Sequence, residues 1–323
     1  MWTGVSFALA AGLMWGLVFV APQMLPDYPA AQLMAGRYLA FGLIALPLAW
    51  LDRRALREFG ATDWWAALRL SAIGNFLYYL CLAAAIQRAG GPLPTMIIGT
   101  LPVLIALVSN HRNRARDGRL PWSRLALPLA LIAAGLVCVN QVELQALASQ
   151  PGERMAAYVQ GGLLAMGALL CWTWYPIRNA DWLRAHPDRS PRAWATAQGL
   201  VTLPLSLLAF LALALLQGSG QIEVDLPLGP RPQVFVGLML AIGLLASWAG
   251  TLCWNEASQR LPTTLVGQLI VFETLAALAY AFLWRHEWPA PLTALGIGLL
   301  VAGVLGALRV RPQPEATQAA EAA

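Results

Sequence analysis

The sequence contains no lysine and few charged residues of any kind. All 21 basic side chains are arginines, and only 11% of the 323 residues are charged, whereas a soluble globular chain has roughly 25%. Hydrophobic residues make up 59%, and the mean hydropathy is +0.60. A water-soluble fold of this length could not cover so much apolar surface. The composition therefore excludes a soluble globular protein.

Cysteine and histidine are also scarce, which limits the chemistry that the chain can carry. The cysteines lie within apolar runs and form no CxxC pair: Cys81, Cys138, Cys171 and Cys253. The histidines lie at run ends or between runs: His111, His186 and His286. They offer no zinc site and no histidine-based triad. The chain also has no GxSxG, HExxH or GxxxxGK(S/T) motif, so we predict no metal, no cofactor and no enzymatic activity.

What the sequence has in quantity is long apolar runs. A helix needs about 20 mostly apolar residues to cross the hydrocarbon core of a bilayer. Ten stretches satisfy this: residues 5–23, 31–50, 66–86, 92–110, 122–141, 157–177, 194–216, 234–256, 263–284 and 291–309. The sequence therefore predicts an all-α integral membrane protein with ten transmembrane helices, whose first run is a retained span.

The arginines are distributed unevenly between these runs. Sixteen of them fall on alternate gaps: Arg53, Arg54, Arg57, Arg69, Arg112, Arg114, Arg116, Arg119, Arg124, Arg178, Arg184, Arg189, Arg192, Arg260, Arg309 and Arg311. Four lie on the other gaps: Arg88, Arg154, Arg231 and Arg285. Because arginine-rich loops stay in the cytoplasm, both termini are predicted there. This bias also accounts for the net charge of +5, so we expect no nucleic-acid partner.

The third and eighth runs match at a fixed offset of 172 residues. The matching pairs are Leu80-Cys81 with Leu252-Cys253, Ala85 with Ala257, and Gln87-Arg88 with Gln259-Arg260. The same offset aligns Leu101-Pro102 with Glu273-Thr274. Because each half has an odd number of runs, the second half enters the membrane in the opposite sense. Such inverted repeats are typical of secondary transporters.

The repeat divides the chain into four parts. We predict a first five-helix repeat at residues 1–145, a periplasmic linker at 146–156, a second five-helix repeat at 157–311 and a disordered cytoplasmic tail at 312–323.

Several segments resemble a known family. They are Gly12-Leu-Met-Trp-Gly16, Gly36-Arg37-Tyr38, Asn75 to Arg88, Thr95 to Val103, Trp254-Asn-Glu-Ala257 and Ile270-Val-Phe-Glu-Thr274. With these segments the chain resembles the drug/metabolite transporter superfamily with two EamA-type repeats, over about residues 3 to 310. The resemblance implies a bacterial inner-membrane permease that exports small metabolites or amino acids. It also implies a central cavity lined by the first four spans of each half.

The chain departs from the family pattern in two places. Glu273 is followed by Thr274, where proline is common, and the Gly-Glu pair that often closes the fourth span of each repeat is missing. Asn110-His111 and His286-Glu287 stand at these positions. These departures leave the predicted architecture intact. They weaken the inference that this chain has the same substrates as other members of the family.

Two charges lie deep within predicted spans. Arg37 is about 10 Å from the outer end of its span, and Glu273 is about 15 Å from the inner end of its own. Such charges usually face a cavity or a partner, because burying one in lipid costs roughly 2.5 to 3.5 kcal/mol. We expect Arg37 to pair with a substrate carboxylate, and Glu273 to bind an amine or the coupling proton. The alternative is a structural pair that joins the two spans.

Aromatic and amide side chains at similar depth could complete a pocket of mixed apolar and hydrogen-bonding character. These candidate substrate-binding residues are Trp15, Asn75, Tyr79, Trp172, Gln198, Trp248 and Gln268, with Asn255 as a weaker candidate nearer the inner interface. The alternative for each is lipid contact or core packing.

Together these features predict a secondary transporter that moves a small metabolite, such as an amino acid, by alternating access. A passive channel is one alternative, and an intramembrane enzyme is a second that lacks the required motifs. The expected partners are the lipid bilayer and a small-molecule substrate. Coupling to protons and assembly into a homodimer both stay open on the sequence.

Overall fold

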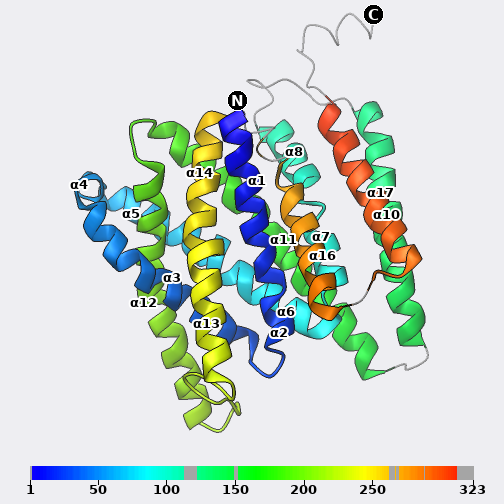
Figure 1. Ribbon diagram of the computed structural model, residues 1–323, viewed down its shortest axis with the longest axis horizontal. Helices are drawn as coiled ribbons and strands as arrows, with labels where there is room; N and C mark the ends of the chain where they lie inside the picture. Colours follow the sequence, from blue (N-terminus) through cyan, green and yellow to red (C-terminus); the bar gives the residue numbers. More distant parts are fainter. Residues whose placement is uncertain are drawn as a thin grey trace, which may run out of the picture.

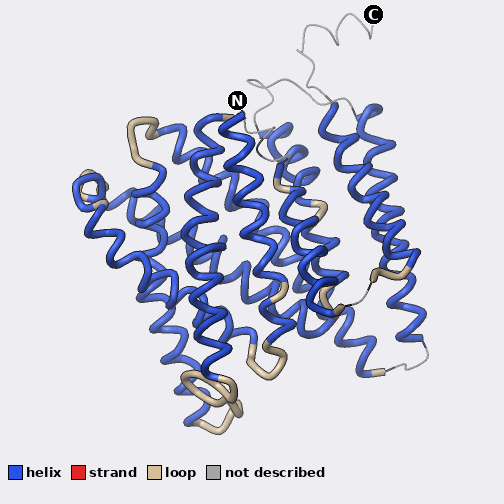
Figure 2. Tube along the Cα trace, viewed as in Figure 1, coloured by secondary structure: helices blue, strands red, loops and turns tan. Residues whose placement is uncertain are grey.

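The computed structural model describes residues 2–112, 122–148, 152–261, 266, 269–286 and 288–310. The described residues form helices and connecting loops, with no strand among them (Figure 2). The predicted tail at 312–323 and the candidate Gln268 lie outside these residues. The all-helical class that the sequence predicted is therefore confirmed for the described part of the chain.

The first half contains the helices labelled α1 to α10 in Figure 1. They are α1 (Trp2–Gly16), α2 (Ala21–Met24), α3 (Ala30–Leu51), α4 (Arg53–Leu56), α5 (Ala61–Leu70), α6 (Tyr78–Ala89), α7 (Pro92–Ile98), α8 (Leu101–Arg112) and α10 (Trp122–Ala148). A short 3₁₀ segment, Leu17–Phe19, joins α1 to α2. A π-helix, Ser71–Leu77, joins α5 to α6.

The second half contains six labelled helices. They are α11 (Glu153–Ala185), α12 (Pro191–Gly218), α13 (Pro232–Ile242), α14 (Gly250–Arg260), α16 (Val271–Arg285) and α17 (Pro291–Arg309). A second π-helix, Gly243–Ala249, joins α13 to α14. Since α10 continues to Ala148 and α11 begins at Glu153, helix extends into both ends of the segment predicted as a linker.

Among the residues that the structure describes, six helical stretches are long and apolar enough to cross a membrane: Trp2–Met24, Ala30–Leu51, Ala61–Ala89, Arg154–Ala185, Pro191–Gly218 and Pro232–Arg260. Three shorter apolar helices lie at Pro92–Ile105, Ala126–Gly135 and Pro291–Gly303. Many leucines on these helices are exposed, for example Leu211 and Leu215 on α12. Apolar side chains exposed over such lengths are suited to contact with lipid.

Proline and glycine mark the ends of several helices. Proline occupies the first turn of α7, α12 and α13, where its missing N–H would have no helical partner. Ser190 caps α12, because its Oγ accepts a hydrogen bond of 3.3 Å from the N–H of Ala193. Gly90 ends α6 with a φ of 75°, which an L side chain rarely adopts. These local signals place the breaks between the helices.

The helices of the two halves pack against each other in matched pairs. Helix α1 contacts α14 and α16 of the second half, while α11 contacts α6 and α7 of the first. Helix α3 packs on α12 at one side of the bundle, and α10 packs on α17 at the other (Figure 1). The two π-helices also correspond, since Ser71–Leu77 and Gly243–Ala249 are separated by the 172-residue offset seen in the sequence.

Glycine allows the closest of these contacts. A Cβ atom added to Gly16 of α1 would lie 2.7 Å from the Cβ of Ala276 and 2.8 Å from the backbone nitrogen of Ala277. A Cβ added to Gly12 would lie 3.0 Å from the backbone nitrogen of Glu273. These two glycines bring α1 onto α16 and so place Trp15 near Glu273.

Candidate functional site

A small cavity lies where helices of the two halves meet. It is lined by Trp15, Val18, Arg37, Tyr38, Asn75, Tyr78, Trp172, Ala246, Thr251 and Glu273. Its volume is about 10 Å³, which is room for about one water molecule. Elements of both halves contribute to its wall. The first half supplies its first three spans, and the second half supplies α11, α14, α16 and the second π-helix. We call it the central cavity.

Arg37 enters this cavity from α3 and is only 4% exposed. Its Nε donates a hydrogen bond of 3.0 Å to Ser247 Oγ. Its guanidinium carbon lies 4.9 Å from the ring centre of Tyr38 and 4.5 Å from that of Tyr79, which are cation–π distances. The Nη1 atom has no hydrogen-bond partner among the described residues. The guanidinium group of Arg37 is thus held by one hydrogen bond and two aromatic rings, and its Nη1 can still donate a hydrogen bond.

Glu273 lies opposite, in the first turn of α16, and is 1% exposed. The N–H groups at a helix N-terminus favour a negative charge there. Its Oε2 accepts a hydrogen bond of 3.1 Å from Trp172 Nε1. Its Oε1 has no partner among the described residues. The carboxyl group therefore has one oxygen held by Trp172, and the hydroxyl group of Tyr78 also lies close to the carboxyl group.

Five residues that line the central cavity have a buried polar atom without a hydrogen-bond partner in the described part of the chain. These atoms are Arg37 Nη1, Tyr38 Oη, Asn75 Nδ2, Tyr78 Oη and Glu273 Oε1. An unpaired buried polar group costs about 1 to 3 kcal/mol, and proteins normally satisfy nearly all of them. With five such atoms around it, the central cavity is the candidate binding site.

The remaining wall of the cavity is aromatic. The ring of Trp172 lies between those of Tyr78 and Tyr175, with centroid distances of 4.7 and 5.1 Å. Trp15 meets Trp172 edge-on at 5.0 Å. Such packing fixes the direction of the Trp172 N–H toward Glu273 and gives the cavity one apolar side.

Of the candidates from the sequence, the structure brings five together at the cavity: Trp15, Arg37, Asn75, Trp172 and Glu273. Tyr79 packs under the guanidinium of Arg37 instead of lining the cavity. Within the described residues, Arg37 and Glu273 form no direct ion pair, since Arg37 donates to Ser247 and Glu273 accepts from Trp172. The two charges face the same space without neutralising each other by contact.

Two other candidates lie elsewhere, in a hydrogen-bonded group that we call the inner network. Tyr175 Oη donates to Gln198 Oε1 at 2.8 Å, and Gln198 Nε2 donates to Asn179 Oδ1 at 3.2 Å. Asn179 Nδ2 then donates to Asn255 Oδ1 at 2.8 Å. Gln198 and Asn255 therefore belong to a paired network. Trp248 is also outside the cavity, with its Nε1 donating to Thr196 Oγ1 at 3.3 Å.

Sequence reasoning missed several residues of the site, namely Val18, Tyr38, Tyr78, Ala246, Ser247 and Thr251. Two of them could have been found from the internal repeat. Ser247 lies 172 residues after Asn75, and Thr251 lies 172 residues after Tyr79. Both Asn75 and Ser247 are on π-helices, which are rare and frequent at functional sites.

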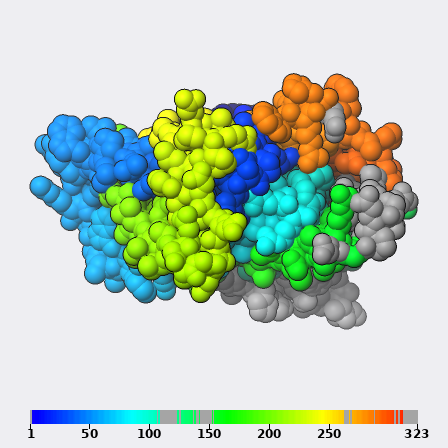
Figure 3. Space-filling view, turned by 90° about the horizontal axis from the view of Figure 1, so that it is seen from below, coloured from blue at the N-terminus to red at the C-terminus, as the bar shows by residue number. Residues whose placement is uncertain are grey.

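At one end of the bundle, the loop before α3 contacts the loop before α13. Arg231 Nε donates a hydrogen bond of 2.9 Å to Asp27 Oδ2, and this bond holds the pKa of Asp27 below its ordinary value of 3.8. Tyr28 Oη donates to the Leu228 carbonyl at 2.9 Å. Figure 3 shows this end, with the yellow-green segment between α12 and α13 beside the dark blue region around α2. We call this contact the outer closure.

At the other end, the segment after α3 pairs with the start of α12. Arg192 Nε donates to Asp52 Oδ1 at 2.7 Å, and Thr196 Oγ1 donates to Asp52 Oδ2 at 2.9 Å. Arg189 forms an ion pair with Glu58. We call this contact the inner closure. Each closure joins one half of the chain to the other, at opposite ends of the bundle.

Helices long enough to cross a membrane surround a closed polar cavity, which is the arrangement of a membrane transporter. A family model described as the EamA-like transporter family matches residues 2–140. The inner membrane protein YtfF of Escherichia coli (strain K12) is 52% identical over 318 residues, which are 98% of either chain. The chain belongs to the EamA-like transporter family, and the predicted resemblance is confirmed.

One further protein and one solved structure are also similar to this chain. The uncharacterized transporter YwfM of Bacillus subtilis (strain 168) is 25% identical over 320 residues, covering 98% of this chain and 96% of the relative. A solved crystal structure has a TM-score of 0.65 at 18% identity, covering 94% of this chain and 96% of the other. At that identity the likeness shows a shared fold. Members of the family are normally transporters and not enzymes.

Proposed function

We propose that the protein is a secondary transporter that exports a small metabolite, such as an amino acid, across the bacterial inner membrane. The observation that supports this most is the set of five unpaired polar atoms around the central cavity. A transport site that opens to each face of the membrane in turn needs polar groups that bind the solute while the site is closed. When no solute is bound, those groups either bind water or have no hydrogen-bond partner.

The charges favour a zwitterionic solute. Arg37 Nη1 offers a donor to a carboxylate, and Glu273 Oε1 offers an acceptor to an ammonium group. Tyr38, Tyr78 and Asn75 can bind the remaining polar atoms, and Trp15 and Trp172 form an apolar wall. An α-amino acid carries both charges and an apolar part on a few atoms, which suits this arrangement.

We further propose ten spans arranged as two inverted repeats, residues 1–145 and 157–311, with both termini in the cytoplasm. The matched helix pairs and the two π-helices at the same offset support the repeat. The start of α1 and the end of α17 lie at the same end of the bundle (Figure 1), as expected for two cytoplasmic termini. The bundle would lie in the membrane with the inner closure toward the cytoplasm.

The two closures suggest how access alternates. With both in place the cavity is sealed, so a transport cycle requires each to break in turn while the other holds. Each consists of a few ion pairs and hydrogen bonds; Arg231 and Asp27 of the outer closure are half-exposed, whereas Asp52 of the inner closure is buried. Solute binding can open a closure only by as much as the solute favours the open state.

The test is counterflow. Purified protein in proteoliposomes, loaded with an unlabelled proteinogenic L-amino acid, should transiently accumulate the same radiolabelled amino acid, and initial rates should saturate with concentration. Empty liposomes provide the control. Flux that rises linearly without counterflow would indicate a channel, and chemical conversion without flux would indicate an enzyme. Absence of flux for every L-amino acid would contradict the proposed solute class.

A further inference from the structure

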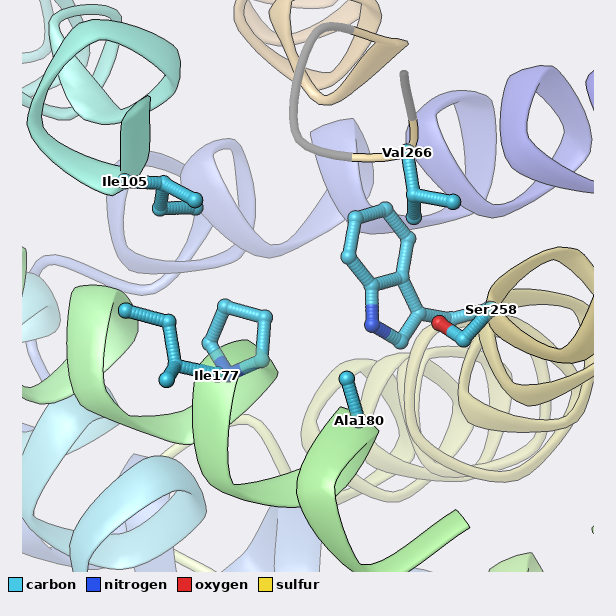
Figure 4. A pocket seen from close by; sticks show the side chains of 7 residues that line it. Ile105, Ile177, Ala180, Ser258 and Val266 are labelled. Atoms are coloured by element: carbon cyan, nitrogen blue, oxygen red, sulfur yellow. The ribbon is translucent and has the colours of Figure 1, made fainter. Parts of the chain in front are cut away.

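A second pocket lies beyond the central cavity, toward the inner closure. It is lined by Ile105, Pro176, Ile177, Ala180, Trp254, Ser258 and Val266, from α8, α11, α14 and the segment that follows α14. Figure 4 shows these side chains converging on a common space. Its volume is about 10 Å³, the same as that of the central cavity. We call it the inner pocket.

The inner pocket continues the same helix faces that line the central cavity. On α11, Trp172 lines the cavity, and Pro176 and Ala180 line the inner pocket at spacings of four residues. On α14, Thr251 lines the cavity, and Trp254 and Ser258 line the inner pocket at spacings of three and four. Residues at these spacings share one side of a helix. A single stripe on each helix thus runs from one space to the other, over about 12 Å along α11.

Trp254 separates the two spaces. Its ring centre lies 5.1 Å from that of Trp15, which lines the central cavity, and Trp254 itself lines the inner pocket. Gly250 makes this arrangement possible, because a Cβ atom there would lie 2.7 Å from Trp15 Nε1. The two indoles therefore form the partition between the central cavity and the inner pocket.

The Trp254 indole also has an unused donor. The side chain is 2% exposed, and its Nε1 has no hydrogen-bond partner among the described residues. A buried tryptophan N–H usually finds a partner. Pro176 adds a potential acceptor nearby, since a proline inside α11 cannot donate to the carbonyl of Trp172. The apolar pocket thus carries a donor from one wall and an acceptor next to the other.

We propose that the inner pocket is the cytoplasmic segment of the transport path and that Trp254 is its gate toward the central cavity. The pocket would hold the apolar part of a small metabolite while Trp254 Nε1 donates to an oxygen of the same solute. This inference rests on the proposed function, because it requires a solute that leaves or enters the central cavity.

Thiol accessibility tests the path without knowledge of the solute. In a chain whose four cysteines are replaced by alanine, Asn75→Cys reports on the central cavity, and Ala180→Cys reports on the inner pocket. A membrane-impermeant methanethiosulfonate is applied to everted vesicles, which expose the cytoplasmic face, or to spheroplasts, which expose the periplasmic face. Ser258→Cys is a second reporter from the opposite wall, should the Ala180 variant fold poorly. Ala165→Cys on α11, which is fully buried outside both spaces, gives the background rate.

We expect Ala180→Cys to react in everted vesicles faster than Ala165→Cys. Adding Ala180→Phe to the Asn75→Cys chain should abolish its labelling in everted vesicles and leave its labelling in spheroplasts unchanged. Ala212→Phe, on the exposed face of α12, is the matched control and should change neither. Trp254→Ala should speed the labelling of Asn75→Cys from the cytoplasmic face, because it removes the partition.

Two results would overturn the inference, and they are distinguishable. If Asn75→Cys reacts from the cytoplasmic face at the same rate with and without Ala180→Phe, the path runs elsewhere while the proposed function stands. If Asn75→Cys reacts from neither face, the central cavity does not open, and the proposed function falls together with the path.

Discussion

The central cavity and the inner network are both buried polar clusters, yet they differ in one respect. In the inner network, Asn179 accepts from Trp194 and Gln198 and donates to Asn255, so its members satisfy one another. In the central cavity, the polar atoms of Arg37 and Glu273 that face inward lack partners. Buried polarity alone therefore does not identify a binding site. Unpaired polar atoms are the feature that separates the proposed site from the network, whose members are paired.

The largest expected effect is on stability, at the hub of the inner network. Asn179→Ala leaves partners on three side chains unpaired, each costing about 1 to 3 kcal/mol, so we expect a loss of at least about 3 kcal/mol in unfolding free energy. Asn75→Ala, the same change in the central cavity, removes an amide whose Nδ2 makes no hydrogen bond and should cost little. Thermal unfolding in detergent compares the two. Equal losses would erase the distinction between the regions.

The largest effect on solute binding should come from Arg37. Arg37→Gln removes the charge that would pair with a carboxylate, and a hydrogen bond to a charged group contributes about 3 kcal/mol, so affinity should fall about 100-fold. Because the change also removes the hydrogen bond to Ser247 and the contacts with Tyr38 and Tyr79, thermal unfolding is measured in parallel to show that the variant is folded. Arg285→Gln, at an exposed position, is the control. Normal counterflow in Arg37→Gln would show that Arg37 serves only to join helices.

A substitution at Glu273 can distinguish solute binding from coupling to the proton gradient. If Glu273 takes up the coupling proton, Glu273→Gln should remove the acceleration of flux by an imposed pH gradient and leave exchange measurable. The measurement is initial flux in proteoliposomes with and without the gradient, beside the wild type. Acceleration that persists in the variant would assign the proton to another group.

A smaller effect is expected at Ser247, which holds Arg37 from the second π-helix. Ser247→Ala frees the Arg37 Nε and should lower solute affinity about tenfold, because a hydrogen bond to a charged group contributes at least about 1.5 kcal/mol. Ser247→Thr should restore most of it. Ser206→Ala, which removes a buried serine of α12 bonded only within its own helix, is the control. An unchanged affinity in Ser247→Ala would show that the aromatic neighbours of Arg37, and not Ser247, fix the position of its side chain.

The smallest effect concerns pH at the outer closure. Pairing with Arg231 lowers the pKa of Asp27 in the folded protein. The stabilisation is therefore present above the ordinary pKa and is lost only as the pH falls through the lowered value. Between about pH 7 and about pH 5 both partners keep their charges, so periplasmic labelling of Asn75→Cys should not respond to pH through this pair. Asp27→Asn should raise that labelling modestly at both values, and a pH response that Asp27→Asn removes would contradict this account.

Much of the fold could be predicted because hydrophobic length and arginine placement act locally. In the described part of the chain, the apolar runs fall on helices. The two mid-span charges, Arg37 and Glu273, line one cavity. Trp15, Asn75 and Trp172 could be predicted as site residues because they lie at a similar depth within their predicted spans. Depth, however, is all that the sequence reveals about a polar residue in a span.

The assignment of partners could not be predicted, because it depends on the rotation of each helix. Gln198 and Asn255 have the same character as Asn75 but face Asn179. Tyr38 and Tyr78 look like packing residues until their hydroxyl groups are found unpaired at the cavity. The π-helices add to the difficulty, since an extra residue in a turn rotates all that follows relative to the 3.6-residue period.

Protection of a cavity thiol by solute tests the central claim most directly. In the Asn75→Cys chain, the rate of thiol modification should fall saturably as the L-amino acid that gives counterflow is added. Adding Arg37→Gln should remove this protection. Full-rate modification at saturating solute, in a protein that still carries out counterflow, would show that the solute binds elsewhere and that the unpaired groups of the central cavity are not its site.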